Sequence, residues 1–284
     1  MMLTTLRPII CALLLTGLLP ASHAAERWQT LPDTPAPIAA ERSGKARVNG
    51  IDLYYAVAGK GAPVILLHGG PANSDYWSGL ATALKKDHTV ILVDSRGHGR
   101  SSDDSRPLSY DRMADDVVQL MNHLKIAKAD IVGWSDGANV GLDIALRHAA
   151  RVGKIVAFGG NTNTSGTIAD ADKNPNFAAF LARAEQEYIK LKKTTPQSYA
   201  AFVEKISVMW GGQPNWTDQQ LASIKSKVLV MDGDHDEAIK LEHTKYIAAK
   251  IPGAKLVILP NTSHFAFLQD PVAFNDTVRA FLAN

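Results

Sequence analysis

The stretch "IVGWSDGANV" (residues 131–140) decides the fold. It runs from β-branched residues, typical of a buried strand, through a glycine, a serine and a second glycine into residues with helical spacing. Gly133 and Gly137 stand two residues before and two residues after Ser135, so the turn between strand and helix has small neighbours. A serine on so sharp a turn points away from the sheet. Ser135 is therefore either an exposed nucleophile or a solvated serine in a close-packed turn.

Strand and helix patterns alternate from residue 46 to the C-terminus. A hairpin with Asn49-Gly50 as its turn comes first. Apolar, strand-like runs follow at 63–70, 89–99, 129–135, 153–160, 226–237 and 254–264, and helical patterns at 75–87, 110–126, 136–152, 240–251 and 270–284. This alternation predicts an α/β fold: a mostly parallel central sheet with helices on both faces. A ligand is expected beyond the C-terminal ends of the strands.

Residues 161–222, here called the cap segment, interrupt the alternation because they contain no strand-like run. Two helices are predicted, at 174–193 and 196–210, and a short third one at 217–224, where Thr217 and Gln220 can form a capping box. A helical insertion at this point predicts a small lid over the strand ends. The core is then divided into residues 46–160 and 223–284.

The N-terminus has the pattern of a secretory signal peptide over residues 1–24, with Arg7 before an apolar run and small residues before a cleavage site after Ala24. The run is short for a membrane span, although an uncleaved anchor remains the alternative. Residues 25–45, rich in proline and alanine, form a leader on the surface. We expect an exported protein, periplasmic or secreted, with no stable membrane span after cleavage.

Composition excludes several classes of function. Cys11 is the only cysteine and leaves with the signal, so the mature chain has no disulfide and no thiol ligand. The formal charge is +2, of which Arg7 supplies one unit, and no basic run suggests nucleic acid. The histidines lack metal-ligand spacing, so neither a metal nor an organic cofactor is expected. The oligomeric state stays open.

A serine hydroxyl needs a base and an orienting acid to act as a nucleophile. His264 follows the last strand-like run, where the base belongs if the chain order is serine, acid, histidine. Other histidines lie on helices or before strands. The preceding strand is followed by four candidate acids, Asp232, Asp234, Asp236 and Glu237, of which Asp232 is closest to the strand. The backbone N–H groups of Gly70 and Asp136 are the expected oxyanion donors.

From about residue 46 onward the chain resembles the α/β-hydrolase superfamily. The residues that carry the resemblance are "HGGP" (68–71), "DSRGHGRS" (94–101), "GWSDGA" (133–138), "GDHD" (233–236) and "SH" (263–264). The strand–turn–helix around Ser135, the nucleophile elbow, is similar to that of valacyclovir hydrolase-type esterases. The "HGGP" loop also resembles that of proline iminopeptidases. The resemblance implies a Ser135–His264–Asp236 triad, because the family pattern of a strand followed by G-x-x-D selects Asp236, with Asp234 as its main rival. The 94–101 loop and His68 are expected in structural roles.

The expected function is that of an exported serine hydrolase that cleaves a small-molecule carboxylic ester or lactone through an acyl-enzyme. An iminopeptidase-like peptidase or amidase is the alternative, and a non-hydrolytic binding protein on the same fold is a third possibility. Trp134, Met209 and Trp210 could form an apolar substrate pocket, although packing explains Met209 and Trp210 equally well. Asp136 could attract a cationic group or simply favour the start of its helix.

Overall fold

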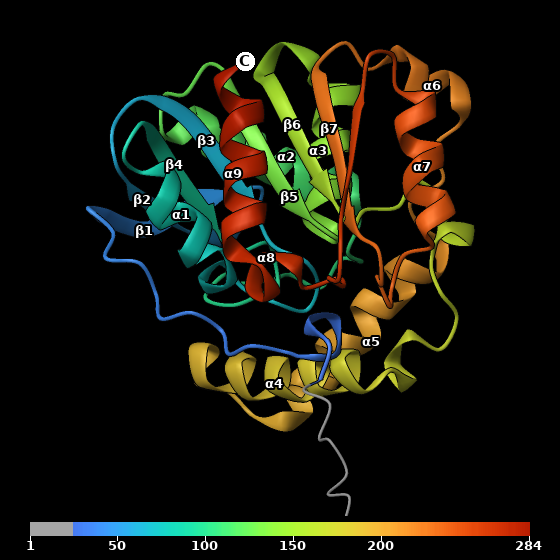
Figure 1. The fold of residues 1–284 in the computed structure, drawn as a ribbon. Helices are drawn as coiled ribbons and strands as arrows, with labels where there is room; N and C mark the ends of the chain where they lie inside the picture. Colours follow the sequence, from blue (N-terminus) through green and yellow to red (C-terminus); the bar gives the residue numbers. More distant parts are fainter. Residues whose placement is uncertain (1–24) are drawn as a thin grey trace, which may run out of the picture.

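A computed structural model describes residues 25–284 and shows one twisted sheet between two layers of helices (Figure 1). The predicted mostly parallel sheet with helices on both faces is confirmed. The predicted signal peptide, with Cys11 in it, lies outside the described residues and stays a prediction.

Within residues 25–284 the sheet has eight strands in the order β1-β2-β4-β3-β5-β6-β7-β8. The strands are β1 (Arg42–Val48), β2 (Ile51–Ala58), β3 (Ala62–Leu67), β4 (His88–Val93), β5 (Ala129–Trp134), β6 (Val152–Phe158), β7 (Lys227–Gly233) and β8 (Lys255–Leu259). β1 pairs with β2, and β2 with β4, in antiparallel register. The six strands β3 to β8 all run parallel to one another. The parallel strands therefore end along one edge, where the polar loops of the sequence gather.

Helices cover both faces of the sheet. The α-helices of residues 25–284 are α1 (Ser78–Leu84), α2 (Tyr110–His123), α3 (Asp136–Arg147), α4 (Pro175–Lys192), α5 (Pro196–Gly212), α6 (Asp218–Ser223), α7 (Leu241–Lys250), α8 (Ala266–Gln269) and α9 (Pro271–Ala283). Apolar residues of α2, α3 and α7 pack on one face and those of α1 and α9 on the other. No helix of the described part of the chain combines the length and the apolar character that crossing a bilayer requires.

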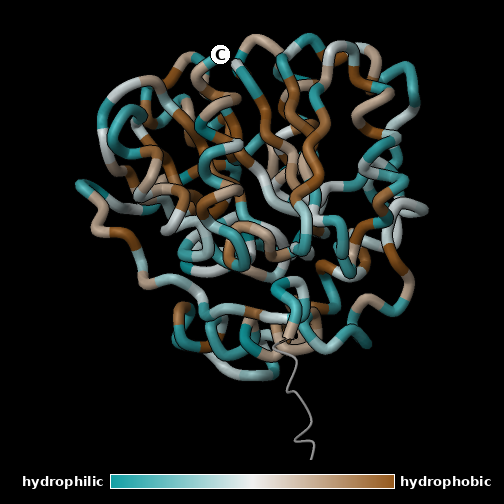
Figure 2. The backbone as a smooth tube through the Cα atoms, viewed as in Figure 1, coloured by the Kyte–Doolittle hydropathy of each residue, from teal (hydrophilic) through white to brown (hydrophobic). Residues whose placement is uncertain are grey.

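Successive residues of each central strand point to opposite cores. On β3, Ile65 and Leu67 belong to the α2–α3 side, whereas Val64 and Leu66 belong to the α1–α9 side. Strands buried on both faces read as continuous apolar runs, which is why the sequence shows them without alternation. In Figure 2 these strands form the hydrophobic interior.

The antiparallel edge of the sheet begins earlier than expected. Asn49 and Gly50 form the hairpin turn as predicted, with φ of 44° and 86°, as a two-residue turn with both residues at positive φ requires. The first strand, however, starts at Arg42, so residues 42–45 belong to the hairpin and not to the leader. Full pairing with β2 over this length stabilises these residues as a strand.

The cap segment contains helices α4, α5 and α6 together with short 3-10 turns. α4 and α5 lie beyond the C-terminal ends of the strands (Figure 1), with Phe180 of α4 reaching one core and Ile206 of α5 the other. α6 packs against α7 and α3, beside the sheet. Its capping box forms between Thr217 and Gln220.

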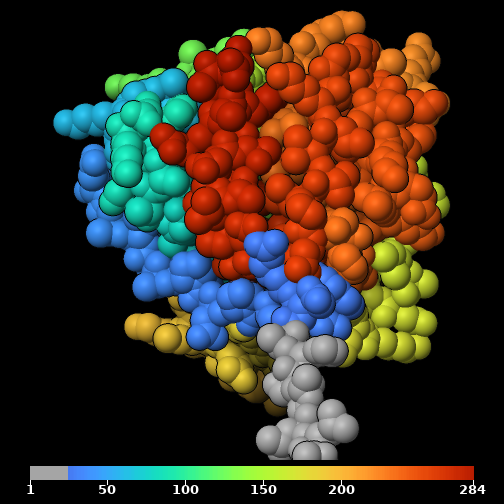
Figure 3. Space-filling view, in the orientation of Figure 1, coloured from blue at the N-terminus to red at the C-terminus, as the bar shows by residue number. Residues whose placement is uncertain are grey.

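Residues 25–41, here called the strap, run over the surface between α4 and the last helices (Figure 3). Arg27 forms an ion pair with Asp270 at the start of α9. On the other side, Arg183 of α4 donates hydrogen bonds to the carbonyls of Pro32 and Leu31, at 2.6 and 3.1 Å. The strap therefore ties α4 to the core.

Candidate active site

Ser135 occupies a strained turn between β5 and α3. Its φ of 53° and ψ of −118° lie in a region that non-glycine residues rarely adopt. A side chain at Gly133 would collide with the carbonyl of Gly137, and one at Gly137 with the carbonyl of Leu67. The two flanking glycines are therefore required by the close approach of backbones, and the serine side chain is left facing a cavity.

His264 and Asp236 are brought together from the two loops that follow β8 and β7. His264 Nδ1 and Asp236 Oδ2 are 2.6 Å apart, and both side chains are at most 2% exposed. The backbone N–H groups of Ala238 and Ile239 donate to Asp236 Oδ1, each at 2.7 Å. The rival acid, Asp234, instead contacts His235 and the N–H of Thr262.

Ser135 and His264 both lie against the end of β6. Ser135 N donates to the carbonyl of Phe158 at 2.8 Å, and the His264 ring lies so close to the next residue, Gly159, that a Cβ there would be 2.9 Å from it. Among the described residues the Ser135 hydroxyl makes no hydrogen bond with His264. Such contacts are often loose in a free enzyme and tighten when substrate binds.

The charges of the pair support each other. Burial lowers the pKa of His264, but the charge and the hydrogen bond of Asp236 outweigh burial and raise the pKa above its ordinary value. Burial acts to raise the pKa of Asp236, and the charge and hydrogen bond of His264 bring it below its ordinary value. An ionised Asp236 beside His264 is the arrangement that favours a proton on the imidazole.

Two backbone N–H groups flank the serine hydroxyl. The loop after β3 lies against the elbow, so closely that a Cβ at Gly69 would be 2.9 Å from Ser135 Cβ. The N–H groups of Gly70 and Asp136 have no hydrogen-bond partner among residues 25–284. Asp136 also begins α3, so the positive end of the helix dipole lies behind its N–H.

The Asp136 carboxylate links the elbow to two other helices. Its Oδ1 accepts hydrogen bonds from Tyr110 Oη at 2.7 Å and from Trp210 Nε1 at 3.0 Å. Burial raises the pKa of Asp136, and these two donors only partly offset the effect. Tyr110, which begins α2, could not be predicted as a site residue, because its partner Asp136 is 26 residues away and no local pattern marks the pair.

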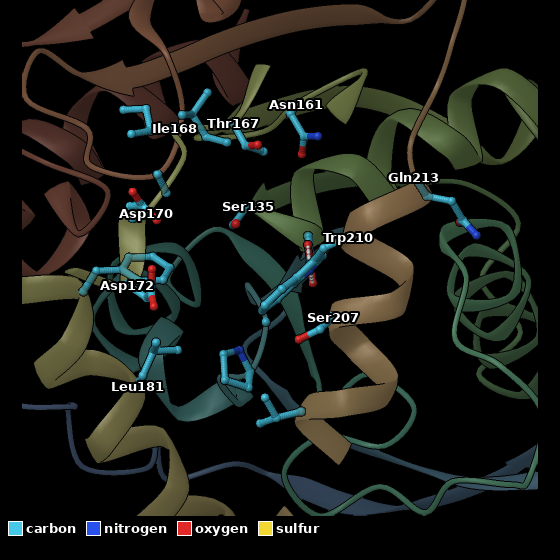
Figure 4. Close-up of a pocket in the computed structure, with 18 of the residues that line it drawn as sticks. Ser135, Asn161, Thr167, Ile168, Asp170, Asp172, Leu181, Ser207, Trp210 and Gln213 are labelled. Atoms are coloured by element: carbon cyan, nitrogen blue, oxygen red, sulfur yellow. Dashed lines mark hydrogen bonds between the residues drawn. The ribbon is translucent and has the colours of Figure 1, made fainter. Parts of the chain in front are cut away.

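A cavity of about 610 Å³ opens at Ser135 (Figure 4). The strand ends supply one wall, and the cap segment supplies the other with Thr167, Ile168, Leu181, Ser207 and Trp210. Acidic side chains also line it, namely Asp136, Asp170, Asp172 and Glu185, without any lysine or arginine.

The pocket prediction is wrong at two of three positions. Trp210 lines the cavity, but Trp134 and Met209 do not. Trp134 is 1% exposed, because its strand places the ring in the core on the α1–α9 side. Met209 is 2% exposed on the core-facing side of α5. Helical rotation therefore sends neighbouring residues 209 and 210 in different directions.

The loop after β4 supports the site without reaching the cavity. Arg96 is 1% exposed and binds Asp116 of α2 through two hydrogen bonds of 2.6 and 2.7 Å. His68, also buried, accepts a hydrogen bond from Ser95 N at 3.0 Å. These contacts are those of structural residues.

The strap contacts the loop that carries His235 and Asp236 and, through Gln269, the loop that carries His264. No pattern in the sequence predicts these contacts. The Trp28 ring stacks on His235 with ring centroids 4.5 Å apart. Gln269 donates to the carbonyl of Thr30 at 2.8 Å and accepts from Ser263 N at 2.7 Å, next to His264. The strap therefore helps to hold the loops that carry the site residues in position.

Known proteins are similar to this chain in sequence and in fold. The profile of the alpha/beta hydrolase family matches residues 64–277. The serine hydrolase BPHL of Homo sapiens is 27% identical over 253 residues, covering 84% of this chain and 86% of that protein. A putative carbamate hydrolase, RutD, of Caulobacter sp. (strain K31) is 30% identical over 260 residues, covering 81% and 96%. Among solved structures, the enol-lactonase of Burkholderia xenovorans LB400 superposes with a TM-score of 0.70 at 25% identity, covering 84% and 100%.

Proposed function

Because the chain belongs to the alpha/beta hydrolase family, we propose that it is a serine hydrolase that cleaves small carboxylic esters, including lactones, through an acyl-enzyme on Ser135. The observation that carries the proposal is the constellation at the strand ends. It combines a strained serine facing a cavity, a buried His264–Asp236 pair and two free backbone N–H groups.

The proposed reaction has two halves. His264 takes the proton of Ser135 as the hydroxyl oxygen attacks the acyl carbon, and the Gly70 and Asp136 N–H groups stabilise the oxyanion. The carbon–oxygen bond to the alcohol breaks, and His264 returns the proton to the leaving alkoxide. Water then attacks the acyl-enzyme with the same base, which releases the acid and restores Ser135. Asp236 holds the imidazole and stabilises its charged form.

The cap segment is the proposed determinant of substrate choice, in the manner of a lid. A cavity of about 610 Å³ has room for a small or medium-sized ester, and its cap wall combines apolar Ile168 and Leu181 with hydroxyls and carboxylates. The relatives act on different bonds according to their names, a lactone and a carbamate among them. One fold supports several leaving groups, and the variable wall selects among them.

The test is Ser135→Ala assayed with p-nitrophenyl acetate. Loss of the nucleophile is expected to lower kcat by about 10⁶-fold with an unchanged circular dichroism spectrum. A fluorophosphonate probe should label the native protein and not the variant. Native turnover that persists in the variant, or a native protein that neither turns over nor takes the label, would refute the proposal and leave a non-hydrolytic binding role.

A second candidate is hydrolysis of an amide-like bond. It is supported by the 30% identical carbamate hydrolase and by the "HGGP" loop, similar to that of proline iminopeptidases. The same machinery applies, with His264 protonating a nitrogen. A panel of matched esters, lactones, carbamates and prolyl amides decides between the candidates by the ratio of kcat/KM values.

We further propose that the protein is exported, by cleavage of residues 1–24. The support is the pattern of Arg7, the apolar run and the small residues that end at Ala24. N-terminal sequencing of protein from the periplasmic or culture fraction of a bacterial host should begin at Ala25. A chain that retains Met1 in the membrane fraction would point to an anchor.

A further inference from the structure

A second carboxyl group lies behind the catalytic acid and has no part in the steps above. Asp232, at the end of β7, is 0% exposed. Its Oδ1 accepts a hydrogen bond from Gly233 N at 2.9 Å, and its Oδ2 accepts one from the hydroxyl of Thr244 on α7. The Asp236 carboxylate lies within hydrogen-bonding reach of this buried carboxyl group.

Two carboxyl groups in contact inside a protein hold one proton between them, because both cannot ionise without a large cost. Among residues 25–284, no lysine, arginine or histidine forms an ion pair with Asp232, and none is among the main influences on its pKa. Asp236, in contrast, accepts from His264 Nδ1 and from the N–H groups of Ala238 and Ile239. Those three donors stabilise the ionised form of Asp236, so the proton resides on Asp232.

We propose that Asp232 is a positioning residue that retains its proton and donates it in a hydrogen bond to Asp236, so that the serine–histidine–aspartate chain has a fourth member. The backbone N–H groups of the loop fix Asp236 from one side, and Asp232 fixes it from the sheet. The kinetic part of this inference rests on the proposed function, whereas the protonation state does not.

The proton on Asp232 also limits the negative charge around His264. The ionisable groups that act on the imidazole are Asp236 and Glu237 from the loop after β7 and Asp136 from the start of α3. Burial, and then the neighbouring Asp236, raise the pKa of Asp232 far above its ordinary range and that of Glu237 to a smaller extent. An ionised Asp232 would add a further charge and raise the pKa of His264 beyond its present value.

The protonation state is tested with Asp232→Asn and an NMR titration of the His264 imidazole. The amide matches a protonated carboxyl in shape and charge. Its two N–H groups can donate to Asp236 and to the Thr244 hydroxyl, which then rotates from donor to acceptor. The midpoint of His264 is therefore expected to stay within about 0.3 pH unit of the native value. If Asp232 is ionised in the native protein, Asp232→Asn removes a charge and lowers the midpoint by about one unit or more, which overturns the proposal.

Asp236→Asn sets the scale for that titration, because it removes a carboxylate in direct contact with His264. It should lower the midpoint by more than about one unit. The titration needs no turnover, so it decides the state of Asp232 even if the proposed ester hydrolysis fails.

The positioning role is tested by comparing Asp232→Leu with Asp232→Asn. Leucine fills the site without a donor, so kcat should fall about tenfold with KM unchanged, as expected for a lost hydrogen bond to a charged group. Asparagine keeps the donor and should retain most of the native kcat. Equal rates in the two variants would overturn the role, and should the leucine variant not fold, a tenfold loss of kcat in Asp232→Asn would do so.

Discussion

The two walls of the cavity are built in different ways. On the sheet wall, backbone contacts fix the reactive groups: Gly133 and Gly137 admit the elbow, and two N–H groups hold Asp236. On the cap wall, the groups are side chains of Leu181, Ser207 and their neighbours on helices. Trp210 joins the two walls through its bond to Asp136.

This difference separates chemistry from selection. Backbone contacts of the kind found at the elbow accept few residue types, so the sheet wall tolerates little change. A helix surface such as that of α4 or α5 accepts many side chains at the same backbone position, and a change there alters the shape of the cavity without moving Ser135. The comparison predicts large effects on rate and stability on the sheet side and small effects, mostly on substrate preference, on the cap side.

Among changes that leave Ser135 in place, the largest expected effect is that of Asp236→Asn. The amide cannot stabilise a charged imidazole and favours the wrong tautomer, so kcat should fall about 10⁴-fold. Steady-state assays with p-nitrophenyl acetate measure this loss of kcat. Asp234→Asn, two residues away on the same loop, is the matched control and should retain activity within about threefold, since its carboxylate contacts His235 and the N–H of Thr262. Equal losses would mean that the acid has been misassigned.

Next in size is the effect of Arg96→Met on stability. The change leaves Asp116 buried without its partner, which typically costs about 3–5 kcal/mol in the free energy of unfolding. Urea denaturation of the variant gives the value. Lys173→Met in the cap segment breaks the exposed pair with Asp170, whose side chains are 72% and 66% exposed, and should change stability by less than about 1 kcal/mol. A loss of similar size in both would contradict the difference between the sheet side and the cap side of the molecule.

The pH dependence comes third. His264 must be neutral to accept the serine proton, and its pKa is raised, so the acidic limb of kcat/KM should have its midpoint above the ordinary value of about 6.5. Each pH unit below that midpoint lowers kcat/KM about tenfold. A midpoint below 6.5 would contradict the influence of Asp236 on His264.

The same pair contributes to stability with the opposite trend. A raised pKa in the folded state means that the contribution is complete below the unfolded value of about 6.5 and is lost as the pH rises through the folded value. Activity therefore increases over the interval in which this part of the stability declines. Thermal denaturation of the native protein and of Asp236→Asn across this pH interval isolates the contribution of the pair to stability.

The smallest expected effect is that of Trp210→Phe, where the two walls meet. Phenylalanine keeps a ring on the cavity but cannot donate to Asp136, which retains Tyr110. We expect kcat/KM to fall about three- to tenfold, corresponding to one hydrogen bond. Substrate preference across esters of different acyl length should shift at the same time. A loss of 10³-fold would place this residue in the chemistry and not in substrate selection.

The same contrast explains how far the sequence could be read. Ser135 and His264 were predicted because strand, turn and chain order restrict where a nucleophile and a base can stand, whereas the family pattern selected Asp236 from four nearby acids. The structure brings His264 and Asp236 into contact. Trp134 and Met209 were misplaced because composition does not reveal which way a side chain faces within a motif or along a cap helix. Asp232 was seen only as a rival acid position near the strand, since its contact with Asp236 depends on how the loop folds back.

The strap has a consequence for the order of events during synthesis. Its partners Asn261 and Asp270 follow Arg27 by 234 and 243 residues, so nearly the whole chain separates the two sides of each contact. Because a ribosome makes the N-terminus first, Arg27 must wait for these partners until the last loop and helix have been made and folded. Docking of this end of the strap is then among the closing steps of folding, and the loops that carry His235 and His264 reach their final positions only when the first-made residues return to them.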